Sequence, residues 1–397
     1  MSIFAGRALK GETVALATKQ ISMVNIPHQN LRIPGPTPIP EPVLAALAQP
    51  MINHRGPEFA AILRRVTEHL RYFFQTRYDI LTFPSAGTGA MEAAVVNLFS
   101  PGEQVAAITI GAFGERFAAI AEVFGLHVRR IAFPWGQAAD PDVVMRELAD
   151  VPDLKGVLMT HNETSTGVTN DVAALARAVR ERYPDALIAV DAVSSLGCID
   201  LPMDALDLDV VFTGSQKGWM VPPGLAIVGV GPRAWAANAR AKLPRMYWDF
   251  AAARRSLEKG QTPYTPPVSL FYGLDVALQL MREEGREAIF ARHARLGALT
   301  RERIRLMGLE LFADRDHASN TVTAVRAPEG LDVKALLKAL REEDGVVLAG
   351  GQQHLEGKIF RIGHLGFVHE PELTAALDAL ERRIGKMAGS TQQIAAS

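Results

Sequence analysis

From about residue 80 the chain alternates short apolar runs with amphipathic stretches, and this feature limits its possible folds more than any other. The alternation is typical of a mainly parallel sheet covered by helices, the α/β class. Strands are expected at 105–110, 128–133, 156–161, 187–191, 210–213 and 225–230. Helices are expected at 115–125, 141–149 and 171–183. With 397 residues, 48% of them hydrophobic, the chain can form a large core and a smaller one.

A proline-rich segment, 263–267, interrupts the alternation before two long helical patterns at 269–284 and 286–307. We therefore place the end of a large domain, residues 34–267, at this segment. A smaller α/β domain, residues 268–386, is expected to follow. Its further strands are expected at 321–326, 346–349 and 359–362, and its helices at 332–343 and 370–386. Residues 1–33 predict an N-terminal arm, either packed on a partner subunit or a disordered leader, and 387–397 predict a frayed polar tail.

The charge balance excludes several kinds of partner. Lys and Arg total 42 against 43 Asp and Glu, so neither nucleic acid nor an anionic membrane is an expected partner. A small molecule is the expected partner. No stretch approaches the ~18 consecutive apolar residues of a membrane-spanning helix. One cysteine, Cys198, excludes an internal disulfide and fits a reducing compartment, so the cytoplasm is the expected location.

Lys217 is the most informative single residue. It lies in the run Thr213-Gly214-Ser215-Gln216-Lys217-Gly218-Trp219, and the apolar run before it, 186–191, ends in Asp191. A lysine among small residues can form an imine with an aldehyde, and an aspartate can keep a pyridine nitrogen protonated. Taken alone, Lys217 would be a surface lysine in a loop. Together the two residues predict a pyridoxal 5'-phosphate site.

Three further segments follow expected strands. Gly87 and Gly89 lie in a glycine-rich turn that opens a helix, which suits a phosphate, although a plain tight turn is the alternative. Phe113 follows the strand at 105–110 and could stack on a pyridine ring or be ordinary core. The polar cluster 161–167 follows the strand at 156–160, where packing alone does not explain it.

Arg361 is a charge inside an apolar strand, and burial of such a charge is costly unless it is paired. An internal salt bridge is one explanation. With a lysine site elsewhere, a receptor for the α-carboxylate of an amino acid is the preferred one, since a planar guanidinium binds a carboxylate through two hydrogen bonds. The ten histidines show no metal-ligand spacing, and Ser194-Ser195 lacks a recognisable hydrolase triad, so no metal site or triad is expected.

From about Pro34 to Leu380 the chain resembles the class V aminotransferase family of fold-type I pyridoxal phosphate enzymes. Within that family it is similar to the serine–glyoxylate and alanine–glyoxylate aminotransferases. The matching segments are 34–36, 87–93, 161–164, 166–171, 190–191, 214–217, 264–266, 291–297 and 360–366.

The resemblance implies a role for each matching residue. Lys217 is expected to be the Schiff-base lysine, Asp191 the partner of the pyridine nitrogen, and Arg361 the substrate carboxylate receptor. Phe113 takes the ring-stacking place that tryptophan often has in relatives. The other implied cofactor contacts are Ala86, Gly87 and Thr88 through the backbone, Gln216, Thr164 at the 3'-hydroxyl, Val193 opposite Phe113, and Thr265 from the neighbouring subunit. This shared site implies a homodimer.

The implied reaction passes an amino group from serine or alanine to glyoxylate or pyruvate, giving glycine or alanine and a 2-oxo acid. Alanine-preferring relatives carry a tyrosine where this chain has Thr262, so the chain is closer to the serine–glyoxylate type. Aspartate and ureidoglycine remain alternative donors. Residues 53–57 and 246–249 are where donor-specific contacts are expected.

Two other functions fit the same fold. One is a pyridoxal phosphate lyase or cysteine desulfurase, which uses a cysteine on a mobile loop. Cys198 instead follows the Asp191 strand, far in sequence from the expected small-domain loop. The other is a non-catalytic subunit, against which the intact set of Lys217, Asp191 and Arg361 argues.

Overall fold

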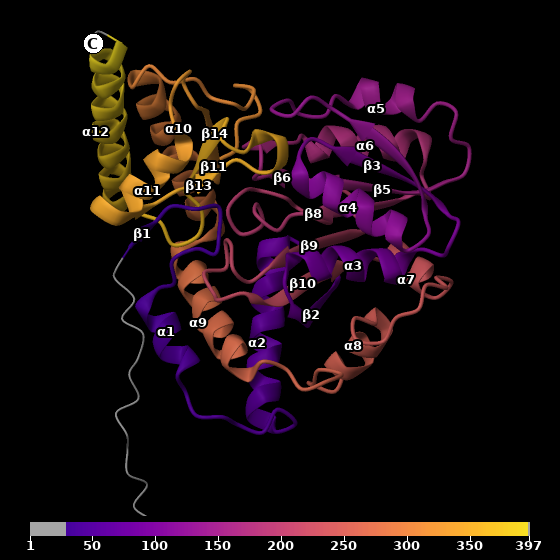
Figure 1. Ribbon diagram of the computed structural model, residues 1–397. Helices are drawn as coiled ribbons and strands as arrows, with labels where there is room; N and C mark the ends of the chain where they lie inside the picture. Colours follow the sequence, from indigo (N-terminus) through magenta and orange to yellow (C-terminus); the bar gives the residue numbers. More distant parts are fainter. Residues whose placement is uncertain (1–28, 396–397) are drawn as a thin grey trace, which may run out of the picture.

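The computed structural model describes residues 29–395 and centres on a seven-stranded sheet (Figure 1). Across the sheet the strands are β2 (Asp79–Ser85), β10 (Gly224–Val230), β9 (Val210–Gly214), β8 (Leu187–Asp191), β5 (Leu154–Thr160), β3 (Gln104–Thr109) and β4 (His127–Ala132). Only β10 runs antiparallel to its neighbours, β2 and β9. The α/β class with a mainly parallel sheet is confirmed, and every strand expected between residues 105 and 230 lies in this sheet.

Helices cover both faces of the sheet because successive strand residues point to opposite sides. In β8, Leu187 and Ala189 belong to one core cluster, and Ile188 and Val190 belong to the other. The first face is covered by α3 (Gly87–Leu98), α4 (Ala112–Val123), α7 (Pro232–Asn238) and α8 (Phe250–Leu257). The second is covered by α2 (Pro57–Phe74), α5 (Pro141–Glu147), α6 (Val172–Arg182) and α9 (Val268–Glu284).

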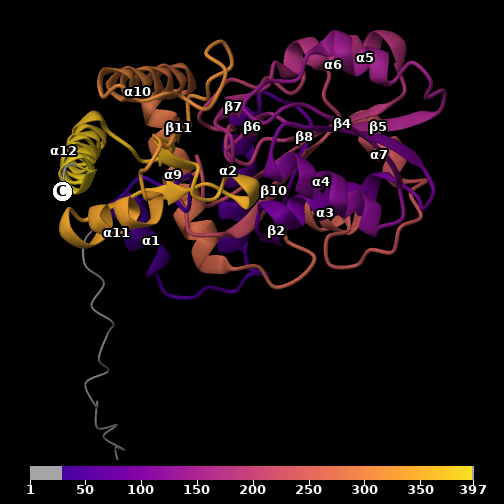
Figure 2. The ribbon, with the colours of Figure 1, turned by 45° about the horizontal axis from the view of Figure 1, so that its top comes forward.

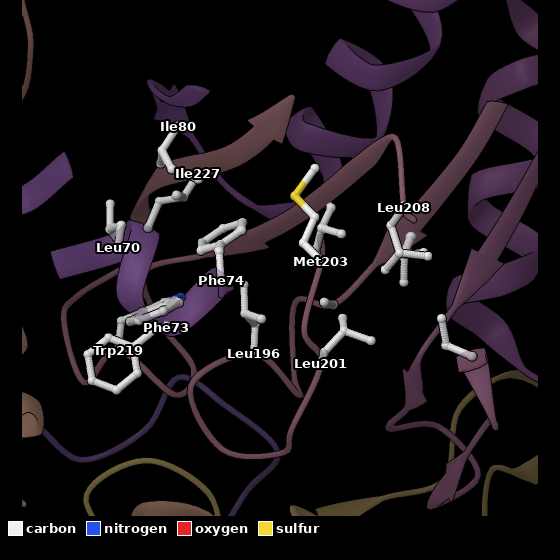
Figure 3. Close-up of a cluster of buried hydrophobic side chains, with 14 of the residues drawn as sticks. Leu70, Phe73, Phe74, Ile80, Leu196, Leu201, Met203, Leu208, Trp219 and Ile227 are labelled. Carbon is white, nitrogen blue, oxygen red and sulfur yellow. The ribbon is translucent and has the colours of Figure 1, made fainter. Parts of the chain in front are cut away.

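The core on the second face of the sheet fixes the position of the segment that carries Lys217. Trp219, two residues further along, is fully buried against Phe73 and Phe74 of α2, with ring centroids 5.8 and 6.3 Å away (Figure 3). Its indole Nε1 donates to Thr213 Oγ1 of β9 at 3.2 Å. Burial of a tryptophan this large fixes the turn that follows β9 to a rigid part of the molecule.

A smaller layer lies beside the large sheet (Figure 2). Its sheet has the order β11 (Val322–Arg326), β14 (Ile359–Gly363), β13 (Ala349–Gly350), and all its pairs are antiparallel. Three helices form its core with these strands: α10 (Arg286–Leu306), α11 (Val333–Glu343) and α12 (Glu370–Ala395). Helix α12 continues past residue 386, where the sequence predicted a tail. Helix α9 packs in the core of the large sheet, although it lies beyond the expected boundary at residue 267.

Short elements connect these layers. Strand β1 (Asn30–Leu31) pairs in parallel with β12 (Val346–Val347), so the first described residues lie beside the smaller layer. Most of the expected N-terminal arm lies outside the described residues. The remaining elements are α1 (Glu41–Leu47), the hairpin strands β6 (Asn162–Glu163) and β7 (Val168–Thr169), and the 3-10 helix Gln353–Leu355. No helix within residues 29–395 is long and apolar enough to cross a membrane.

Candidate active site

A cavity of about 120 Å³ lies where the carboxyl ends of the parallel strands meet. Nine of the residues predicted from the sequence line it: Ala86, Gly87, Thr88, Phe113, Thr164, Asp191, Val193, Gln216 and Lys217. Four more, to which the sequence assigned no role in the site, line it too: Met91, Arg116, Asn162 and Ser194. A larger open groove of about 1010 Å³ beside Trp135 and Phe312 contains none of the predicted residues.

Lys217 reaches the cavity from the turn after β9. Its amine donates to the carbonyl of Pro34, and the backbone there approaches so closely that a Cβ on Gly35 would lie 2.7 Å from Nζ. Gly35 also has a φ of +112°, which favours glycine. Burial, together with the charge of Arg361, lowers the pKa of the amine to about 8, and Asp191 opposes this shift.

Asp191 is the last residue of β8, and only 3% of it is exposed. Its Oδ1 accepts one hydrogen bond, from the backbone N–H of Val193 at 2.9 Å. Burial raises the pKa of the carboxyl to about 7, and Glu163 adds to this shift, whereas the Val193 hydrogen bond, Lys217 and Arg116 oppose it. The carboxyl therefore lies in a place that favours its ionised form only when a cation comes close.

The start of α3 forms a cradle on the cavity wall. Its N-cap, Ala86, is extended, and no side chain caps the helix, so no capping side chain accepts from its first backbone N–H groups, and Ala86, Gly87 and Thr88 line the cavity. A Cβ on Gly87 would lie 2.7 Å from Val193 Cγ2, which leaves no room for a side chain. The buried Oε1 of Gln216 has no hydrogen-bond partner. An amide can take either orientation, so this side chain can present its N–H₂ group to an anion.

Arg361, in the middle of β14, and Thr265 do not line the cavity. Arg361 is 5% exposed; its Nη1 donates to the carbonyl of Thr164, which does line the cavity, at 2.9 Å, and its Nε donates to the carbonyl of Gly350 at 2.8 Å. Burial lowers its pKa to about 10. Among the side chains that the structure describes, residues 29–387, none forms an ion pair with Arg361, so the salt bridge considered from the sequence is absent among them. Thr265 is exposed.

Residues 31–364 match the model of the family named Aminotransferase class-V. The chain belongs to the class V aminotransferases. The family resemblance seen in the sequence is thereby confirmed, and the protein is an aminotransferase of this class.

Named relatives are similar over most of their length. A protein of Anabaena cylindrica named soluble hydrogenase 42 kDa subunit is 46% identical over 88% of this chain and 92% of its own. L-aspartate–glyoxylate aminotransferase of Paracoccus denitrificans is 40% identical over 84% of this chain and 85% of its own. The solved alanine–glyoxylate aminotransferase of Nostoc sp. superposes with a TM-score of 0.88 at 30% identity, covering 92% of this chain and 97% of its own. Other relatives are named serine–glyoxylate aminotransferases.

Membership of this family implies pyridoxal 5'-phosphate as the cofactor, and the residues present fit that group. A buried carboxylate without a cationic partner suits a protonated ring nitrogen. An uncapped helix start with a glycine that cannot carry a Cβ suits a phosphate. A buried amine suits the aldehyde carbon.

Proposed function

We propose that this aminotransferase passes an amino group from serine or alanine to glyoxylate or pyruvate with pyridoxal 5'-phosphate as cofactor. The observation that carries the proposal is one cavity lined by Lys217, Asp191 and the start of α3. The guanidinium of Arg361, which has no anionic partner among the described side chains, donates to the backbone carbonyl of Thr164 in the cavity wall. A site that combines cofactor-binding groups with a buried cation suits a small α-amino acid, because the cation can bind the amino acid's carboxylate. Its products would be glycine or alanine and a 2-oxo acid.

When bound, the cofactor supplies an electron sink that lets the Cα–H bond of the amino acid break. Lys217 is the proposed attachment point and the group that takes the Cα proton at Nζ. Its pKa of about 8 makes a large fraction of the amine neutral near that pH, as a nucleophile or base must be. Asp191 would keep the ring nitrogen charged, and the same pairing would return its own pKa toward the ordinary range.

Phe113, Thr164 and Val193 are the proposed contacts of the ring, and Ala86, Gly87, Thr88 and Gln216 those of the phosphate. Arg361 is the proposed receptor for the substrate carboxylate. Two of its nitrogens are held by carbonyl groups, which fixes the direction of the guanidinium while its charge stays unpaired within the described residues. A carboxylate that reaches it in this buried place gains a charge-assisted, bidentate contact.

We further propose a homodimer in which Thr265 contacts the phosphate in the partner's site. The segment before it is held on the surface by Arg55, whose Nη1 donates to the carbonyl of Thr262 at 2.7 Å. Tyr264 stacks on Tyr247 with centroids 5.4 Å apart, and Tyr247 and Met246 are exposed. Exposed apolar side chains around an ordered loop suit a subunit interface.

Aspartate is the second candidate donor. Arg116 lines the cavity and forms no ion pair in the described part of the chain, so a second carboxylate would find a cation there. The relative from Paracoccus denitrificans, named for aspartate and glyoxylate, supports the same candidate. Ureidoglycine remains a further alternative.

The lyase or cysteine desulfurase function and the non-catalytic subunit are less well supported than transamination. Cys198, the only cysteine of the chain, is buried, and burial raises its pKa to about 11, so its thiolate is disfavoured as a sulfur acceptor. The Anabaena cylindrica relative is named a subunit of a soluble hydrogenase, but the set of Lys217, Asp191 and Arg361 argues against a non-catalytic subunit here. The proposed location is the cytoplasm, because a lone free cysteine fits a reducing compartment.

The test is a panel of amino donors with glyoxylate and with pyruvate as acceptors, followed as keto-acid formation. Serine and alanine are expected to be used best with glyoxylate, and a strong preference for aspartate would replace them with the second candidate. Lys217→Ala should abolish turnover with every donor, because no other amine lines the cavity as described. Lys242→Ala, an exposed lysine, is the matched control. Near-normal turnover by Lys217→Ala would refute the proposed site.

A further inference from the structure

Glu163 is a buried carboxylate that the proposed chemistry does not use. It has no exposed surface and lies in the hairpin strand β6, beside the cavity residues Asn162 and Thr164. Four hydrogen bonds reach it. Its Oε2 accepts from the backbone N–H groups of Phe113 at 2.9 Å and Gly114 at 3.1 Å. Its Oε1 accepts from the N–H of Ser165 at 3.1 Å and the hydroxyl of Ser165 at 2.6 Å.

These partners hold Glu163 as a carboxylate. Three are backbone N–H groups, which can only donate, and the Ser165 hydroxyl already accepts from the N–H of Ala112 at 2.9 Å. Burial raises the pKa of Glu163, and the four hydrogen bonds oppose that shift. The N-terminus of α4 favours a negative charge for the same reason that any helix start does. Glu163 and Ser165 together satisfy the first three N–H groups of this helix.

The helix start that Glu163 anchors carries Phe113. The backbone N–H of Phe113 is one of the bonded groups, and its ring lies in the cavity wall with the guanidinium of Arg116 4.8 Å from the ring centroid. The fit is close, because a Cβ on Gly111, at the N-cap of α4, would lie 2.4 Å from Glu163 Cγ. The side chain of Glu163 therefore packs directly against the segment that presents this ring.

The same turn also presents the contact to Arg361. Thr164 follows Glu163 directly, lines the cavity, and accepts from Arg361 Nη1 at 2.9 Å. Glu163 therefore joins two parts of the site that come from different elements: the aromatic ring of α4 and the guanidinium of β14. Its charge is also felt by both Asp191 and Arg361.

We propose that Glu163 is a positioning residue, which holds Phe113 against the cofactor ring by binding the first N–H groups of α4 while its turn fixes Arg361. This inference rests on the proposed function and extends it to a residue with no direct contact to the cofactor. The main effect of Glu163 is to fix the position of the Phe113 ring, and its contribution to the stability of the fold is secondary.

The test is a double-mutant cycle between Glu163→Gln and Phe113→Ala. A glutamine must turn its N–H₂ group toward at least one backbone N–H group, which can only donate. It therefore loses at least one of the hydrogen bonds made by Glu163 and weakens the anchoring of α4, either directly or through Ser165. We expect Glu163→Gln to weaken pyridoxal phosphate binding by the cofactor-free protein roughly 10-fold, measured by absorbance titration. The visible circular dichroism of the bound cofactor should also change. In the Phe113→Ala background, Glu163→Gln should add less than about a threefold loss.

Asp209→Asn is the matched control. Asp209 is equally buried and paired with Arg180 and Arg233, but it lies in the segment before β9, away from the cavity. Its variant should lower the melting temperature without changing the dichroism of the bound cofactor. If Glu163→Gln does not fold, Ser165→Ala removes one donor without changing charge and should move the dichroism in the same direction.

Four outcomes separate the possibilities. Additive losses for Glu163→Gln and Phe113→Ala would overturn the positioning role, as would an unchanged dichroism in both Glu163→Gln and Ser165→Ala. A wild-type protein that binds no pyridoxal phosphate would instead refute the proposed function. A coupled loss together with the changed dichroism supports the inference.

Discussion

Lys217 and Asp191 share one cavity with opposite shifts in pKa. Burial lowers the pKa of the amine to about 8 and raises that of the carboxyl to about 7. Both charged forms are therefore costly without a bound cofactor, even though they attract each other. A positively charged ring nitrogen beside Asp191 would relieve its share of this cost, so cofactor binding and the stability of the protein are linked.

Removing Asp191 should change how stability depends on pH. Its folded pKa is raised from 3.8 to about 7, so the folded protein holds a proton that the unfolded chain has lost. Its contribution to stability is present below the unfolded pKa and is lost as pH rises from about 4 through 7. In cofactor-free protein, Asp191→Asn should therefore gain melting temperature relative to wild type between pH 5 and pH 7.5. A constant difference across that range would contradict the shift.

Arg361 should separate substrate binding from cofactor binding. Truncation of a buried charge pair costs on the order of 2–4 kcal/mol, so Arg361→Ala should lower kcat/KM for amino acid and glyoxylate roughly 30-fold to 1000-fold. Lysine should restore only part of this loss, because it cannot form two parallel hydrogen bonds. The visible absorbance of the bound cofactor should stay near normal.

Arg326→Ala is the control for that measurement. Arg326 belongs to the same small sheet, but its side chain is exposed and lies over Phe312. Its variant should retain kcat/KM. Loss of the cofactor with unchanged substrate affinity in Arg361→Ala would remove Arg361 from the proposed carboxylate site.

At the scale of elements, the site is built from the segments that follow five strands. The turns after β2, β3, β5, β8 and β9 bring Gly87, Phe113, Thr164, Val193 and Lys217 to the same edge of the sheet. Parallel strands have this effect because their carboxyl ends point the same way. The small sheet adds only Arg361, through β14.

The start of α3 should tolerate no added side chain. A Cβ on Gly87 would lie 2.7 Å from Val193 Cγ2, so Gly87→Ala must displace either the helix start or Val193. We expect at least a tenfold loss of pyridoxal phosphate affinity, since a shift of about 1 Å is enough to misplace a bound group. Gly385→Ala in α12, where a Cβ meets nothing within 4 Å, is the control and should stabilise the protein by about 0.5–1 kcal/mol. Equal cofactor affinity in the two variants would argue against the phosphate cradle.

At the scale of the whole molecule, the exposed face around residues 246–265 is the proposed partner contact. Met51, Met246 and Tyr247 are 64%, 68% and 44% exposed. Large apolar side chains are costly to leave in water, whereas a second copy of the chain would cover them. The interpretation of Thr265 as a contact in the partner's site depends on this arrangement.

Mixed dimers test that arrangement. Lys217→Ala and Thr265→Asp should each be weakly active alone, since one lacks the amine and the other places a charge beside the phosphate. A dimer with one chain of each kind has one site with both changes and one with neither. Activity should therefore return on mixing and refolding, to about half the wild-type value per pair because one of two sites is intact. No recovery, despite dimers seen by light scattering, would place Thr265 outside the partner's site.

Much of the fold and part of the site could be predicted from the sequence. The strands from 105 to 230 have periodic apolar patterns, and Lys217 and Asp191 lie in local runs whose neighbours set their surroundings. The family resemblance supplied the expected roles of Phe113, Thr164 and Val193, which the structure brings to one cavity. It also supplied Arg361, which lies beside the cavity and not in its wall.

The tertiary structure alone decided the contacts between distant segments. Nothing local marks Glu163 as the anchor of α4 or Gly35 as the residue beside Lys217, because each depends on a group about 50 or 180 positions away. Helix α9 likewise follows the proline-rich segment in the sequence but packs with the large sheet, because its apolar face meets α1 and α2 there. Periodicity records which face of an element is apolar, and only packing determines what that face meets.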